Sequence, residues 1–180
     1  MYYQREHSWA KEAEKYNVKR PGHSQNWSNH NRGRKEELVT QGQAHGIIVF
    51  SGDRPVGWCA YGAKEEFPAI DRGRFYRKLH LRDGSKLWRI ACLYVDSKYR
   101  RKGVSKFALQ ATLASIRRKG GGTVEAYPRT SKRGGSSNLW FGTIGMFERE
   151  GFKTVAPLGV SALVRKSVPA LKTGSSKSEP

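Results

Sequence analysis

The stretch WRIACLYVDSKYRRKGVSKF at residues 88–107 constrains the fold of this chain more than any other. Apolar residues alternate along its first half, with Ile90, Cys92 and Tyr94 on one side, which predicts a β-strand. The basic turn RRKGVS follows at 100–105, and apolar positions at helical spacing come after it. A strand, a basic turn with a glycine and a helix N-terminus together favour an anion site, because unpaired backbone N–H groups and the positive end of the helix dipole point into the turn.

The turn resembles a cofactor-binding motif. Its spacing is neither that of a P-loop nor that of a dinucleotide-binding loop. It is similar to motif A of the GNAT superfamily of acetyltransferases, R/Q-x-x-G-x-G/A, with Arg100 and Gly103 in place and Ser105 where the family has a glycine or alanine. Further along, MFEREGFKTV resembles motif B, which commonly ends in a pair like Gly151 and Phe152. Two motifs in the right order are more specific than either alone.

The sequence predicts three segments. Residues 1–34 form a polar extension, with a short helix around Trp9–Tyr16 and a turn-rich stretch over 21–34. Residues 35–168 form the domain that resembles the GNAT family. Residues 169–180, rich in Ser, Lys, Gly and Pro, form a disordered basic tail.

Within the domain, helix and strand patterns alternate, which favours a mixed α/β (α+β) fold. The resemblance implies a GNAT-like, mostly antiparallel central sheet flanked by helices and splayed between its strands at about 88–96 and 123–127. The charged stretch 63–87 fits an insertion that contacts the acceptor. The predicted elements are a helix at 35–43, a hairpin of strands at 46–50 and 55–62, a strand at 88–96, a helix at 103–118, a strand at 123–127, a helix at 142–150, a strand from 152 and a strand at 161–168.

Charge favours an anionic partner. The chain has 34 Lys and Arg against 15 Asp and Glu, a net charge of +19, and such a field attracts nucleic acid, acidic proteins or the phosphates of a cofactor. An alternative function is therefore a nucleic-acid-binding module, associated with tRNA or the ribosome, on the same fold with little or no catalysis. Aromatic residues among basic ones, such as Trp9 and Trp27, would stack on bases in that case.

Other classes of protein are disfavoured. No apolar run reaches the ~18 residues of a membrane span, and the first residues lack the apolar core of a signal peptide. Cys59 and Cys92 both lie in apolar strand-like contexts, as expected of two buried thiols in a reducing cytoplasm. The five histidines lack metal-ligand spacing. We therefore expect a cytoplasmic protein without a metal.

The resemblance implies that acetyl-coenzyme A binds at the turn and that an amine attacks it directly. The acceptor stays open: a small amine, a protein N-terminus or lysine, or an aminoacyl-tRNA; a homodimer is also possible. Main-chain groups of the central strand would pair with the pantetheine arm, and one N–H there would polarise the acetyl carbonyl. The candidate cofactor-binding residues are Leu93, Tyr94, Val95, Arg100, Arg101, Lys102, Gly103, Val104, Ser105 and Lys106.

Glu125 is the candidate general base. It lies between Val124 and Ala126 on the strand beside the central one, where burial would raise its pKa toward working pH. The run Val-Glu-Ala resembles the Leu-Glu-Val of GNAT enzymes that acetylate ribosomal-protein N-termini. The alternative is a glutamate that pairs with a neighbouring Arg or Lys. Asp96, His80, Glu65 and Glu66 are lesser candidates.

Phe147 departs from the family pattern, because many members have a tyrosine there as general acid. Another hydroxyl (Tyr94, Tyr127 or Ser105) or water would then protonate the leaving thiolate, or it leaves unassisted. A third possibility is a protein that binds coenzyme A without chemistry. Tyr127 and Trp140, with Phe141, are candidates for an acceptor pocket or for the core.

Overall fold

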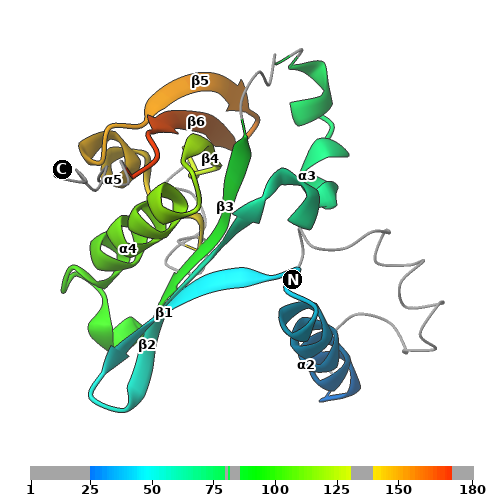
Figure 1. The fold of residues 1–180 in the computed structure, drawn as a ribbon, viewed down its shortest axis with the longest axis vertical. Coiled ribbons are helices and arrows are strands. Elements are labelled where there is room, and N and C mark those ends of the chain that lie inside the picture. Colours follow the sequence, from blue (N-terminus) through cyan, green and yellow to red (C-terminus); the bar gives the residue numbers. More distant parts are fainter. Residues whose placement is uncertain (1–24, 80, 82–85, 131–139, 172–180) are drawn as a thin grey trace, which may run out of the picture.

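The computed structural model describes residues 25–79, 81, 86–130 and 140–171, and within them the strands form one six-stranded sheet in the order β1-β2-β3-β4-β6-β5. β3 and β4 run parallel, and the other neighbouring pairs are antiparallel. The β1–β2 hairpin and the β5–β6 hairpin lie at opposite ends of the sheet (Figure 1). This architecture confirms the mixed, mostly antiparallel α/β sheet predicted from the sequence. The strands are β1 (His45–Ser51), β2 (Arg54–Ala63), β3 (Leu87–Val95), β4 (Gly122–Ala126), β5 (Lys153–Leu158) and β6 (Ser161–Val168).

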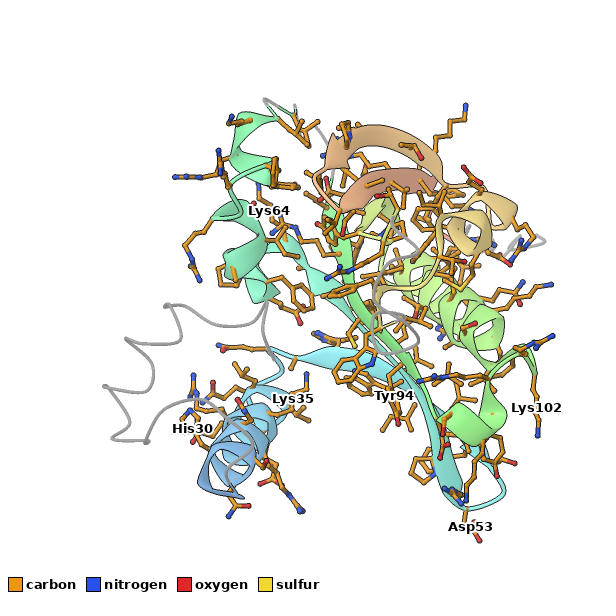
Figure 2. All side chains as sticks on the ribbon, turned by 180° about the vertical axis from the view of Figure 1, so that it is seen from behind. His30, Lys35, Asp53, Lys64, Tyr94 and Lys102 are labelled. Carbon is orange, nitrogen blue, oxygen red and sulfur yellow. The ribbon has the colours of Figure 1, made fainter. Side chains whose placement is uncertain are left out.

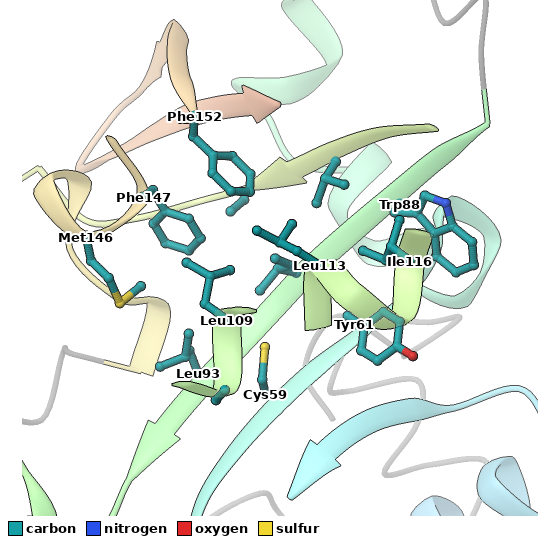
Figure 3. Packing of buried hydrophobic residues seen from close by; sticks show 14 of the residues in the cluster. Cys59, Tyr61, Trp88, Leu93, Leu109, Leu113, Ile116, Met146, Phe147 and Phe152 are labelled. Atoms are coloured by element: carbon teal, nitrogen blue, oxygen red, sulfur yellow. The ribbon is translucent and has the colours of Figure 1, made fainter. Parts of the chain in front are cut away.

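Helices cover both faces of the sheet. The longest described helices are α2 (Gln25–Thr40) and α4 (Val104–Arg118), of which α4 packs on the sheet. α4 lies against β1, β2 and β3, and its buried Leu109, Leu113 and Ile116 pack on the apolar side chains of these strands (Figure 3). The shorter helices are η2 (Lys64–Glu66), α3 (Pro68–Asp71), η3 (Tyr76–Lys78), η4 (Ser97–Tyr99) and α5 (Ile144–Arg149).

The strict alternation predicted for β3 is wrong at one point. The register with β2 shifts so that Ala60 faces Cys92 while Tyr61 faces Ile90, which leaves one extra residue in β3. Such a bulge reverses the sides that later residues occupy. As a result Ile90 and Leu93 both join the core beneath α4, and Tyr94 is exposed outside it.

The bulge lies where the sheet opens. The ladder between β3 and β4 runs from Leu87 opposite Thr123 to Ile90 opposite Ala126, and β3 continues to Val95 without a partner in β4. The structure therefore shows the splay that the resemblance implies.

Two other predictions need correction. α2 begins at Gln25 rather than near residue 35, so part of the stretch predicted as turns is helical. Ion pairs spaced by three or four residues support this helix, including Arg32 Nε to Glu36 Oε1 at 2.9 Å. The stretch 63–87, where the sequence analysis places no helix or strand, contains three short helices that cover part of the face opposite α4.

Some predictions fall outside the described residues. These are the helix around Trp9–Tyr16, the side chains of Trp27 and His80, and the tail beyond Leu171. The tail's first residues are described, and the backbone N–H of Leu171 donates to the carbonyl of Arg117 at 3.1 Å.

Candidate functional site

A cavity of about 740 Å³ lies beside the part of β3 that has no pairing with β4. It brings together nine of the ten candidate cofactor-binding residues, all except Lys102, and it adds Trp140 from the acceptor candidates. The structure thus places Trp140 beside the strand end and turn at 93–106, two segments that the sequence linked only by resemblance. The nine residues are Leu93, Tyr94, Val95, Arg100, Arg101, Gly103, Val104, Ser105 and Lys106.

The N-terminus of α4 supplies uncapped N–H groups to this cavity. Gly103 is the N-cap, in the left-handed region at φ +81°, and no side chain caps the helix. The first intrahelical bond runs from Phe107 N–H to the Gly103 carbonyl at 3.0 Å, so the N–H groups of Val104, Ser105 and Lys106 have no intrahelical acceptor. These three residues line the cavity. The arrangement suits an anion.

The shape of the turn depends on unusual backbone conformations. Arg101 has φ +62°, which is uncommon for a residue other than glycine. A Cβ on Gly103 would meet no atom within 4 Å, so its conformation and not lack of space favours glycine there. Arg100 and Arg101 bring their charges to the same wall.

Lys102 points elsewhere. Its Nζ lies 5.3 Å from the ring centroid of Tyr99, outside the cavity wall, and Figure 2 shows it directed away from Tyr94. The Arg54 guanidinium lies 5.8 Å from the same ring. Two cations thus make cation–π contacts with the ring of Tyr99, which itself lines the cavity.

Glu125 lies on the face opposite α4, because Val124 and Ala126 alternate with it toward that helix. It is completely buried. Its Oε1 accepts from Nε of Arg165 at 2.8 Å, and its Oε2 accepts from the hydroxyl of Tyr127 at 2.7 Å. The hydroxyl of Tyr76 donates to Oε2 at 2.9 Å.

Arg89 completes this buried cluster. Its Nε lies 3.6 Å from Oε2 of Glu125, and its Nη atoms donate to Asp71 at 2.6 and 2.9 Å. Burial alone would lower the pKa of Arg89, but the bonds to Asp71 raise it. Burial, followed by the nearby Glu125 charge, raises the pKa of Tyr76 to about 12 and that of Tyr127 well above its usual value.

These contacts do not support Glu125 as the base. It is not among the residues lining the cavity, and donors from three side chains occupy its oxygens. The alternative from the sequence, a glutamate paired with arginine, is what the structure shows. Tyr127 lies in the same cluster, away from the cavity wall.

The lesser candidates for a base that the structure describes, Asp96, Glu65 and Glu66, also lie outside the cavity wall. Asp96 accepts from Arg54 at 3.0 Å and from the Lys98 N–H at 2.9 Å. Glu66 pairs with Nδ1 of His45 at 2.9 Å. Glu65 does not line the cavity either.

The wall nearest the exposed end of β3 is aromatic. The rings of Tyr94 and Trp140 meet edge to face with centroids 6.1 Å apart, and both residues line the cavity. Phe147 is fully buried and packs on Phe152 at 5.1 Å, so it does not take part in this wall. Of the hydroxyls considered as proton donors, Tyr94 and Ser105 line the cavity.

Sequence reasoning missed part of the wall. One signal was available: Thr143, Met146 and Glu150 recur at spacings of three and four residues, which places them on one face of α5. Tyr99 adjoins the basic turn in the sequence. The residues missed are Tyr99, Gly142, Thr143, Met146, Arg149 and Glu150.

The described ranges contain neither of two other kinds of site. No group of three or more His, Cys, Asp or Glu there could hold a metal ion. Among the described helices, none has the length and apolar character to span a membrane.

The sequence matches the family model "Acetyltransferase (GNAT) family" over residues 6–140. A search of curated proteins found no significant match. A structure assigned to the GNAT family from Desulfovibrio desulfuricans has a TM-score of 0.54 at 14% identity and covers 81% of this chain and 83% of its own. An N-acetyltransferase from Staphylococcus aureus Mu50 has a TM-score of 0.50 at 17% identity, with coverage of 77% and 74%. At these identities the likeness shows a shared fold.

Proposed function

Because this chain belongs to the GNAT family of acetyltransferases, we propose that it transfers an acetyl group to a primary amine by direct attack within a ternary complex. N-acetyltransferase activity and the use of acetyl-coenzyme A belong to the family. Beyond these family properties, we propose the direct attack and the class of acceptor. The observation that carries it is one cavity lined both by the uncapped N-terminus of α4 and by the unpaired end of β3.

The cavity wall suits the two parts of acetyl-coenzyme A. The N–H groups of Val104, Ser105 and Lys106, with the charges of Arg100 and Arg101, suit its phosphates. Leu93, Val95 and Met146 add apolar surface along the wall for the pantetheine arm. When bound, the cofactor supplies a thioester-activated acetyl group.

The residues at the end of β3 act on the reacting group in this proposal. A main-chain N–H of residues 93–95 would donate to the acetyl oxygen and stabilise the charge that develops there. We propose Tyr94 as the donor to the leaving sulfur, since β3 carries it beside those N–H groups while Ser105 lies in the anion turn. Water in the cavity takes the proton of the amine, because Glu125 lies outside the cavity wall.

Calorimetric titration with acetyl-coenzyme A tests the proposal, with ATP as the anion control. Saturable binding that is tighter than that of ATP supports it. Gly103→Ala forces a side chain into a left-handed turn, so we expect the dissociation constant to rise roughly tenfold or more. Gly52→Ala is the matched control, because Gly52 also has positive φ and open space around its Cβ position but lies in the β1–β2 turn. Equal effects of the two substitutions, or equal weak binding of both ligands, would contradict the proposal.

The net charge of +19 favours a second candidate, binding of nucleic acid on the same fold. It differs from the first in its dependence on salt, because binding to nucleic acid releases counterions. We also propose a reducing cytoplasm as the compartment, because Cys59 and Cys92 are free thiols and Cys59 is buried.

A further inference from the structure

Arg129 follows β4, and its guanidinium has a buried donor without a hydrogen-bond acceptor among the described residues. Its Nε is buried and has no hydrogen-bond partner in the described part of the chain. Buried N–H groups are almost always paired in proteins, so an unpaired one calls for a physical explanation. The cost is larger for a charged group, since a shielded cation without a counter-ion destabilises the fold.

The other shielded arginines nearby are balanced. The Nε of Arg89 also lacks a hydrogen-bond partner, but its charge is compensated, because Arg89 pairs with Asp71 and lies 3.6 Å from Glu125. Arg165 pairs with Glu125. No described carboxylate forms an ion pair with Arg129. Among the described residues, the arginines around Glu125 thus have counter-ions, whereas Arg129, after the end of β4, has none.

The position of Arg129 connects that charge to the cavity. Its backbone forms a parallel bridge with Thr143, which lines the cavity. Trp140, three residues before Thr143, also lines it and packs against Tyr94. Arg129 itself does not line the cavity, so its cation lies one backbone bridge behind this wall, just after the strand that parts from β3.

The charges of the cavity wall favour the same ligand. Arg100, Arg101, Lys106 and Arg149 line it, against Glu150 as the acidic residue. The phosphates of the cofactor offset Arg100 and Arg101 in the proposed function, but Lys106 and Arg149 still repel an acceptor that arrives as an ammonium ion. A second group on the acceptor with negative charge reverses this repulsion.

We propose that Arg129 binds an oxyanion, carboxylate or phosphate, on the acceptor, so that the acceptor is an amine that also carries an anionic group. The planar fork of a guanidinium matches both oxyanions with two parallel hydrogen bonds. Tyr94 and Trp140 provide the apolar surface that the body of the acceptor contacts. This inference rests on the proposed acetyl transfer and names the substrate class of the same site.

The test compares amines that differ by the anion alone. L-Phenylalanine against phenethylamine reports on a carboxylate, and O-phosphoethanolamine against ethanolamine reports on a phosphate. Binding is measured by calorimetry with protein saturated with coenzyme A, and transfer by release of free thiol from acetyl-coenzyme A. We expect the anionic member of at least one pair to bind roughly 10- to 100-fold more tightly, the range for one charge-assisted contact.

Variants assign the preference to Arg129. Arg129→Gln should remove it while leaving the neutral amine unchanged, and Arg129→Lys should retain part of it. Arg118→Gln, at the exposed end of α4, removes the same charge away from the cavity and should keep the preference.

Two outcomes overturn the inference: an equal response to both members of each pair, including no response to any, or a preference that survives Arg129→Gln. Failure of acetyl-coenzyme A to bind at all would instead overturn the proposed function. A protein that binds acetyl-coenzyme A without an anion preference overturns the inference alone.

Discussion

At the scale of single residues, buried charge decides the role of Glu125. Removing one partner from a buried ion pair leaves the other charge uncompensated, which costs about 3–5 kcal/mol. Glu125→Gln should therefore lower the free energy of unfolding by about that amount, because Arg89 and Arg165 lose their shared counter-ion. Urea denaturation followed by circular dichroism measures it. Acetyl-coenzyme A affinity of the folded variant should stay the same.

The control is Glu36→Gln, which removes an exposed ion pair with Arg32. Exposed pairs contribute about 0–1 kcal/mol, so its stability should hardly change. The opposite result for Glu125→Gln, a large drop in kcat at unchanged stability, would restore its predicted role as base.

Buried Cys59 and half-buried Tyr76 predict weakening of the fold in alkali. Burial raises the pKa of Cys59 to about 12, and burial with the Glu125 charge raises that of Tyr76 to about 12. In the unfolded chain these groups lose their protons near pH 9 and 10. The unfolded state then binds fewer protons than the folded one, so stability falls as pH rises.

The melting temperature should therefore be flat below about pH 8.5 and fall between pH 9 and 12. Tyr76→Phe removes one of the two groups and should make the fall shallower, as thermal melts across this range would show. A steeper fall in the variant would contradict this account.

At the scale of elements, the sequence predicted what depends on neighbouring residues. The strand, basic turn and helix around Gly103 are local, and the structure has α4 within one residue of its predicted bounds. The bulge in β3 depends on β2, so alternation within residues 88–96 could not show it. The partners of Glu125 come from β3, β6 and η3, which are far apart in the chain. The residues around Glu125 in the sequence therefore could not show that arginines pair with it.

The splay between β3 and β4 makes a prediction for hydrogen exchange. Residues 88–90 of β3 pair with strands on both sides, whereas residues 91–95 have no partner in β4. Backbone groups without a protein partner exchange readily, and a ligand that pairs with them slows exchange. Binding of acetyl-coenzyme A should therefore protect peptides over 91–95 and leave those over 88–90 unchanged. Protection confined to α4 would show that the cofactor does not pair with β3.

At the scale of the whole molecule, the parallel pair β3–β4 within an antiparallel sheet creates the site. Antiparallel neighbours can pair along their full length, but these two diverge after Ile90 and Ala126. The opening exposes backbone of β3 next to the helix that follows it, and α5 closes the far wall. One departure in the ladder thus places the anion turn and the unpaired backbone in a single cavity.

The net charge of +19 gives the last prediction, because it separates the two candidate functions. Binding to nucleic acid releases counterions, so its affinity falls by orders of magnitude between 50 and 200 mM salt when several phosphates are contacted. Acetyl-coenzyme A has few charges and also contacts the apolar wall of a formed cavity, so its affinity should fall much less. Titrating a single-stranded RNA and acetyl-coenzyme A over this range compares the two directly. If acetyl-coenzyme A binding falls as steeply as RNA binding, the cavity acts as a general basic surface and nucleic-acid binding becomes the leading function.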